Sequence, residues 1–139
     1  MKKYLWVLLI VSFSAAGFEL SEADYALIEG DSKLCSSGHA QILKDEGEET
    51  FILGPVISIP IIKEKTIDQV AGGKCQQVDE LKDSKNKMIF TSIIQNCSKD
   101  AKHLEKRVVE TVWFEGDKLF YTNVQGSVTK KCHFQKEKK

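Results

Sequence analysis

The chain lacks the short motifs that mark most catalytic and metal-binding proteins. It has no C-x-x-C pair, no G-x-S-x-G segment and no glycine-rich phosphate loop. Their absence disfavours zinc ribbons, thioredoxin-type redox centres, serine hydrolases and dinucleotide sites. The three histidines, His39, His103 and His133, are scattered and lack paired metal-ligand spacing. We therefore expect no enzyme, no cofactor and no metal.

Three weaker polar patterns are candidates for catalytic groups. Segment 36–39 places two serines near His39, and Glu48–Glu49 and Asp79–Glu80 are paired carboxylates of the kind used in acid/base chemistry. Such runs are more often solvated faces of strands and turns. We interpret all three as surface.

Charge of one sign is not in excess, because 20 Lys and Arg balance 20 Asp and Glu. Nucleic-acid binding requires a basic excess with interleaved aromatic residues, so no nucleic-acid partner is expected. The lysine-rich end, 136–139, is predicted to be a flexible basic tail.

Long hydrophobic runs are confined to the N-terminus. Lys2 and Lys3 precede an apolar run at 5–11 and small residues at 12–17. This order is typical of a secretory signal peptide, and the run is shorter than the roughly 20 residues that a membrane span needs. We predict a signal peptide over 1–17, a periplasmic or secreted protein, and no stable membrane anchor.

Cysteines are few but even in number. Cys35, Cys75, Cys97 and Cys132 predict two disulfides in an exported chain. Three pairings are possible, and loop entropy does not choose among them. Cys75 and Cys97 flank the turn-like segment 83–87 almost symmetrically, so a hairpin would join them at its base. That geometry favours Cys75–Cys97 together with Cys35–Cys132.

Prolines number only two, and both lie within the segment 51–62, which has no charged residue. A half-exposed strand has a polar residue at every second position, yet only Ser58 fits that pattern here. The segment is predicted to be a buried pair of strands. If one face is not covered, it lines a cavity or forms a patch for a partner.

Elsewhere the periodicity changes from helical to strand-like. Ser21 and the acids after it favour a short helix over 21–29, with Leu20, Ala23, Leu27 and Ile28 as its buried stripe. Alternation then predicts strands from 39 onward, a loop or single helical turn at 67–73, a helical turn at 98–103, and a strong hairpin around Gly116.

Together these features predict a mainly β fold: a small antiparallel meander barrel or two-layer sheet of about seven or eight strands, with one short N-terminal helix. Residues 18–135 form a single disulfide-braced β domain in this prediction. Closing the meander would protect its edges and place the first strand beside the last.

The outline resembles the small secreted barrels of the lipocalin-like kind. Their G-x-W motif is missing, since His39 and Ala40 follow Gly38, and no family is assigned. The hypothesis is a binding protein that holds a small apolar molecule or lipid. The predicted ligand-binding residues are Ile57, Ile59, Ile61, Phe90, Trp113, Phe114, Phe120 and Tyr121. The alternative is a protein-binding module, such as an inhibitor of an extracellular hydrolase, acting through loop 44–50 or 63–74. The oligomeric state is not predicted.

Overall fold

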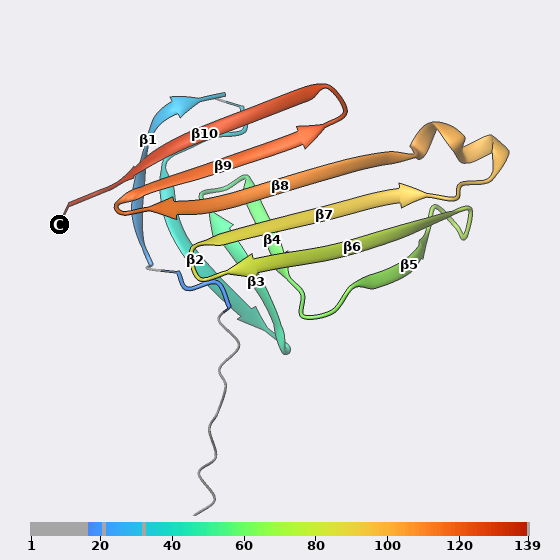
Figure 1. The fold of residues 1–139 in the computed structure, drawn as a ribbon, viewed down its shortest axis with the longest axis horizontal. Helices are drawn as coiled ribbons and strands as arrows, with labels where there is room; N and C mark the ends of the chain where they lie inside the picture. The colour runs from blue at the N-terminus through green and yellow to red at the C-terminus, as the bar shows by residue number, and fades with distance from the viewer. Residues whose placement is uncertain (1–16, 21, 32, 139) are drawn as a thin grey trace, which may run out of the picture.

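The computed structural model describes residues 17–20, 22–31 and 33–138. These residues form one open antiparallel sheet of ten strands in the order β4-β3-β2-β1-β10-β9-β8-β7-β6-β5 (Figure 1). The elements are β1 (Ala23–Gly30), β2 (Gly38–Asp45), β3 (Glu48–Leu53), β4 (Ile57–Ile61), β5 (Thr66–Val70), β6 (Cys75–Ser84), β7 (Lys87–Gln95), η1 (Lys99–Leu104), β8 (Lys106–Glu115), β9 (Lys118–Gln125) and β10 (Val128–Lys136).

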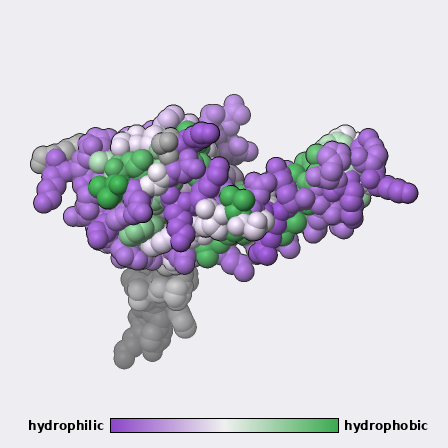
Figure 2. Space-filling model, turned by 90° about the horizontal axis from the view of Figure 1, so that it is seen from above, coloured by the Kyte–Doolittle hydropathy of each residue, from purple (hydrophilic) through white to green (hydrophobic). Residues whose placement is uncertain are grey.

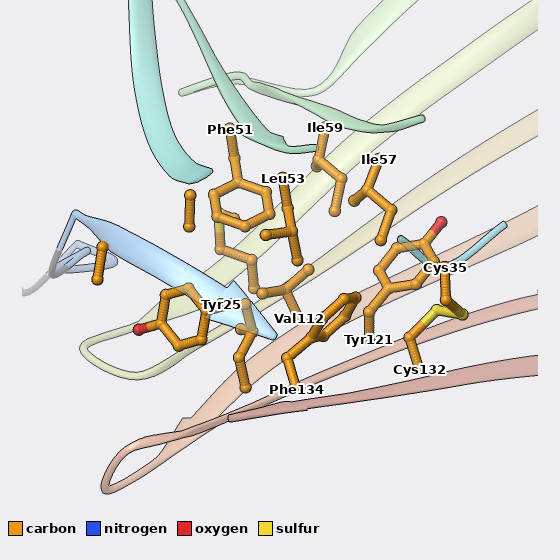
Figure 3. Close-up of a cluster of buried hydrophobic side chains, with 14 of the residues drawn as sticks. Tyr25, Cys35, Phe51, Leu53, Ile57, Ile59, Val112, Tyr121, Cys132 and Phe134 are labelled. Carbon is orange, nitrogen blue, oxygen red and sulfur yellow. A yellow bond between two sulfur atoms is a disulfide. The ribbon is translucent and has the colours of Figure 1, made fainter. Parts of the chain in front are cut away.

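The sheet curls so that β1 to β4 lie behind one half of the long strands β6 to β10 (Figure 1). Side chains from the two layers point toward each other, as Phe51 and Ile59 do toward Val112 and Phe134 (Figure 3). All four are fully buried. Alternation along each strand explains the arrangement, because every second residue faces this shared core.

The other half of β6 to β9, with β5 and η1, projects beyond the core as an arm (Figures 1 and 2). Its buried apolar residues, Cys75, Val78 and Ala101, do not belong to the main core cluster. The arm therefore depends on strand pairing and on its own disulfide for much of its order.

The two predicted disulfides are confirmed. Cys35–Cys132 joins the loop after β1 to β10, and Cys75–Cys97 ties the start of β6 to the segment that follows β7. The 83–87 turn is also confirmed, since Ser84 and Lys87 are the last pair of the β6–β7 hairpin. The β8–β9 hairpin turns at Gly116 as expected.

The predicted helix over 21–29 is wrong. Ala23–Gly30 is strand β1, paired with β2 and β10. The helical spacing predicts that Ile28 belongs to a buried stripe and that Tyr25 does not. In the structure Ile28 is 58% exposed, whereas Tyr25 is buried. The alternating set of Ala23, Tyr25 and Leu27 meets the core instead, because tertiary pairing overrides a weak helical preference. Ser21, the predicted cap, lies outside the described residues.

The predicted strand count of seven or eight is too low. The two additional strands are β1 and β5, the second of which occupies the segment predicted as a loop or helical turn. The only helix in the described part of the chain is η1, a 3-10 helix at the predicted helical turn. Residues 1–16 of the predicted signal peptide lie outside the described residues, and that prediction stands untested.

No helix within the described residues is long and apolar enough to cross a membrane. The C-terminal strand β10 extends through Lys136, so the predicted tail begins one residue inside the sheet.

Candidate functional site

The eight predicted ligand-binding residues lie on two different faces of the sheet. Four of them, Ile57, Ile59, Phe90 and Tyr121, are buried within the core cluster. Ile61 and Phe114 are partly buried and pack against that cluster. The remaining two, Trp113 and Phe120, neighbour the buried Val112 and Tyr121 in sequence and therefore face outward.

Trp113 and Phe120 belong to a cross-strand stack on the outer face of the sheet. The ring centroids of Trp113 and Phe120 are 5.1 Å apart, and those of Phe120 and His133 are 4.6 Å apart. The Lys87 ammonium lies 6.0 Å from the Trp113 ring centroid. Because the rings face one another, the stack braces β8, β9 and β10 and leaves mainly ring edges for contact with other molecules.

A surface depression of about 410 Å³ lies over this stack. Its lining includes Thr122, Lys131, Glu29 and Gly30 beside the three rings. Three of the predicted residues, Trp113, Phe120 and Tyr121, line this depression, which lies on the face opposite to the isoleucines.

The second region of interest is the seam where the sheet fails to close. Within the described residues, β4 and β5 are the two ends of the strand order. β5 pairs with β6 only between Cys75 and Asp79. In the part of the chain that the structure describes, residues 80–84 of β6 have no paired strand on the β5 side, and β4 has none on the side away from β3. Two strand edges thus flank an opening.

Two adjoining depressions occupy the seam and are here called the seam groove. The first, of about 480 Å³, is lined by Gly17, Phe18, Ile42, Glu49, Ile61, Ile62, Lys63, Leu81 and Asp83. The second, of about 390 Å³, is lined by Gly47, Glu48, Glu49, Thr50, Pro60, Ile61, Ile62, Lys63 and Asp79. They adjoin because Glu49, Ile61, Ile62 and Lys63 line both.

Strand alternation explains why apolar side chains converge here. Ile42 follows the buried Ala40 on β2, and Ile61 follows the buried Ile57 and Ile59 on β4. Leu81 of β6 is paired with the buried Phe90. Each is therefore the last inward-facing apolar residue before the groove opens, packed against the core on one side and exposed to the groove on the other.

Phe18 covers one end of this apolar surface. Its ring centroid lies 6.0 Å from that of Phe51 and 5.5 Å from that of Phe114. Its backbone N–H donates to Asp83 Oδ2 at 3.2 Å, and the N–H of Glu19 donates to the carbonyl of Lys85 at 2.9 Å. The N-terminal segment is thereby held against the end of β6.

The groove also contains inward-facing carboxylates. Glu49 precedes the buried Phe51 on β3 by two positions, and Asp79 and Asp83 flank Leu81 at the same spacing on β6. The sequence pattern predicts that Glu48–Glu49 and Asp79–Glu80 are solvated pairs. In the structure one member of each pair, Glu49 or Asp79, is half-buried on the groove side.

A separate buried polar contact marks the boundary between core and arm. The Tyr121 hydroxyl donates to Glu110 Oε1 at 2.5 Å, and the Asn123 amide lies 3.4 Å from the same hydroxyl. Burial and the bond to Glu110 raise the pKa of Tyr121 above its usual range. The neutral phenol therefore anchors β9 to β8 where the core ends.

Ile61 is the one predicted ligand-binding residue that lines the seam groove. Four apolar residues that line the groove were not among the predicted ones: Phe18, Ile42, Ile62 and Leu81. The alternation signal could place Ile42 and Leu81 on a face, but the sequence does not show where the sheet stays open. That depends on the short pairing between β5 and β6.

No protein-family model matches the chain, and no curated protein matches it in sequence. Solved structures match only in fold. Apo lipid binding protein 8 of Caenorhabditis elegans is 18% identical, with a TM-score of 0.48, covering 83% of this chain and 94% of that one. Human cRBP IV is 15% identical, with a TM-score of 0.49 and coverages of 86% and 99%.

The fatty acid binding protein of Schistosoma mansoni, solved in complex with arachidonic acid, is 13% identical, with a TM-score of 0.48 and coverages of 84% and 95%. Because identities and TM-scores are this low, what the chain binds has to be inferred from its own residues.

Proposed function

We propose that this chain is an exported binding protein that holds a small apolar molecule or lipid in the seam groove. The observation that carries the proposal is the meeting of Ile42, Ile61, Ile62 and Leu81 in adjoining depressions at an unclosed seam. Ile61 and Ile62 end the uncharged segment 51–62, for which the sequence predicts a cavity or a partner patch where one face is not covered.

The size and lining of the groove support this role. Its two parts measure about 480 and 390 Å³, within the range of roughly 300–1,000 Å³ found for small-molecule sites. Apolar side chains form the floor of the groove and charged side chains form its rim. In small-molecule sites the apolar lining usually provides most of the affinity, and a few polar groups fix the orientation of the ligand. The floor packs on a fully buried core, so the site is largely preformed.

Export is part of the proposal. Two disulfides fit an oxidising compartment outside the cytoplasm, and the predicted signal peptide would deliver the chain there. A periplasmic or secreted location would expose the groove to lipids and apolar metabolites of the cell envelope or its surroundings.

The test is binding of the neutral fluorophore N-phenyl-1-naphthylamine and its displacement by dodecanol. We expect saturable binding, weakened about tenfold by Leu81→Ser, because a full apolar side chain leaves the groove floor. The matched control is Ile89→Ser, on the neighbouring strand β7 but on the outward-facing side. Equal loss in both variants, or no saturable binding by the native chain, would contradict the proposal.

A second candidate function is supported by the arm. Ile67, on the edge strand β5, is 62% exposed, and an unpaired edge with an apolar side chain can accept a strand from a partner protein. This candidate corresponds to the predicted inhibitor acting through segment 63–74. It is tested by inhibition assays against a defined panel of secreted proteases, in which Ile67→Lys must abolish any tight inhibition.

A further inference from the structure

The charges around the seam groove are unequal. Four carboxylates line it, those of Glu48, Glu49, Asp79 and Asp83, against the single ammonium of Lys63. Four acidic residues and one basic residue give the groove lining a formal charge of −3. The whole chain, in contrast, carries equal numbers of acidic and basic residues. The groove is therefore an acid-rimmed apolar surface within a neutral chain.

The inward direction of Glu49 and Asp79 is unusual for carboxylates on a β-strand. Positions that alternate with buried apolar residues are normally apolar themselves, because a carboxylate facing the core loses hydration. Glu49 nevertheless lies two positions before the buried Phe51, and Asp79 lies two positions before Leu81, which packs against the core. Both carboxylates are half-buried. A carboxylate at such a position is favoured when a cation comes to lie beside it.

The existing partners supply little positive charge. Glu49 has an ion pair with Lys44 at 3.4 Å, in which the Lys44 side chain is 75% exposed. Asp79 accepts hydrogen bonds from the neutral amide of Gln77 at 3.0 and 3.2 Å. Asp83 accepts one from the backbone N–H of Phe18. No lysine or arginine among the described residues forms an ion pair with Asp79.

The two ends of the groove differ in part of their lining. Phe18, Ile42 and Leu81 line only the larger depression, and Glu48 and Asp79 line only the smaller one. Glu49 lines both, and Asp83 lies in the larger one beside Leu81. A ligand that spans both would place an apolar chain on Leu81 and Ile42 and its polar group near Asp79. The exposed Lys63 lies at the junction.

We propose that the natural ligand is a cationic amphiphile, an apolar chain bearing an amine or other positive group, rather than a fatty acid or another anionic lipid. The proposal rests on the proposed function, since it concerns the same groove. The apolar part lies on Ile42, Ile61, Ile62 and Leu81, and the positive group lies between Asp79 and Glu49.

The experiment compares three probes with the same chain: dodecylamine, dodecanol and dodecanoate, each below its micellar concentration at pH 7. Affinity is measured by displacement of N-phenyl-1-naphthylamine. We expect dodecylamine to bind about tenfold more tightly than dodecanol, and dodecanoate more weakly than both, because a charge-assisted contact replaces a neutral one. The advantage of the amine should shrink as salt is raised from 0.05 to about 0.5 M.

Three variants locate the effect. Asp79→Asn should remove most of the advantage of the amine over dodecanol. Its control is Glu80→Gln, the adjacent residue on the outward-facing side of the same strand, which should change neither affinity. Lys63→Gln should strengthen amine binding about twofold, because it removes the one opposing ammonium from the lining.

The outcomes separate this inference from the proposed function. If dodecanoate binds as tightly as dodecylamine, the cationic preference is wrong while the apolar site stands. If Asp79→Asn and Glu80→Gln have equal effects, the preference is a general surface-charge effect and the inference fails. If none of the three probes displaces the fluorophore, the proposed function fails, and this inference fails with it.

Discussion

The two disulfides stabilise different parts of the molecule, and removing them one at a time tests that division. The chain-entropy model relates the stabilisation to the length of the closed loop. The Cys35–Cys132 bridge spans 97 residues, for which the model gives about 4.7 kcal/mol. The Cys75–Cys97 bridge spans 22 residues, for which it gives about 3.4 kcal/mol.

The places of the two bridges in the fold add to this difference in stabilisation. Cys35 and Cys132 are each 2% exposed and belong to the main core cluster. Figure 3 shows their bond beside Tyr121 at the end of the cluster. Cys75 is buried too, but within the arm and apart from that cluster. Loss of the first bridge therefore loosens the global fold, and loss of the second mainly loosens the arm.

The assay uses two double variants, Cys35→Ala with Cys132→Ala and Cys75→Ala with Cys97→Ala. Urea unfolding should show a loss of free energy about 1 kcal/mol larger for the first pair. Hydrogen exchange of the second should rise in β5 and η1 while β1 and β3 stay protected. Equal losses, or a rise in exchange throughout the sheet when only the arm bridge is absent, would refute the division into core and arm.

Three further predictions concern single residues. Ile59→Ala should lower the free energy of unfolding by about 2–5 kcal/mol in urea titrations, because the side chain is fully buried and its removal leaves a cavity. A loss below about 1 kcal/mol would contradict a tightly packed core. Gly30→Ala should lower the free energy of unfolding by about 1–3 kcal/mol in the same assay, because the φ angle of Gly30 is +151° and an added Cβ would lie 2.7 Å from Cys35 Sγ. An unchanged urea midpoint would contradict this. Because the pKa of Tyr121 is raised in the folded protein, its neutral phenol stabilises the fold. This stabilisation is complete below pH ~10, the ordinary pKa of tyrosine, and is lost as the pH rises above that value. Unfolding followed between pH 9 and 11 should therefore show a decline that Tyr121→Phe reduces, and an identical decline in both proteins would disprove the assignment.

Much of the fold could be predicted from the sequence because strand alternation and turn residues are local signals. Met88 and Phe90 alternate with half-buried neighbours as expected of a strand with one face on the core. Gly116 marks a hairpin, and the symmetry of Cys75 and Cys97 about their turn was enough to choose the correct disulfides.

The errors arose where local pattern and tertiary pairing disagree. Segment 21–29 has apolar spacing that fits a helix and also alternation that fits a strand, and only pairing with β10 decides between them. The site was harder still. Alternation shows that Trp113 and Val112 face opposite ways but not which of them faces the core. Trp113 and Phe120 were therefore grouped with the isoleucines although they lie on the opposite face. Nor does any local pattern show that β5 leaves the end of β6 unpaired.

The central claim is that an apolar molecule occupies the seam groove, and methyl NMR with dodecanol tests it most directly. In isotope-labelled native protein, titration with dodecanol should shift the methyl signals of the apolar residues that line the groove, which are Ile42, Ile61, Ile62 and Leu81. The indole signal of Trp113, in the depression on the opposite face, should not move. Shifts centred on Trp113 with none at Ile61 and Leu81 would contradict the account.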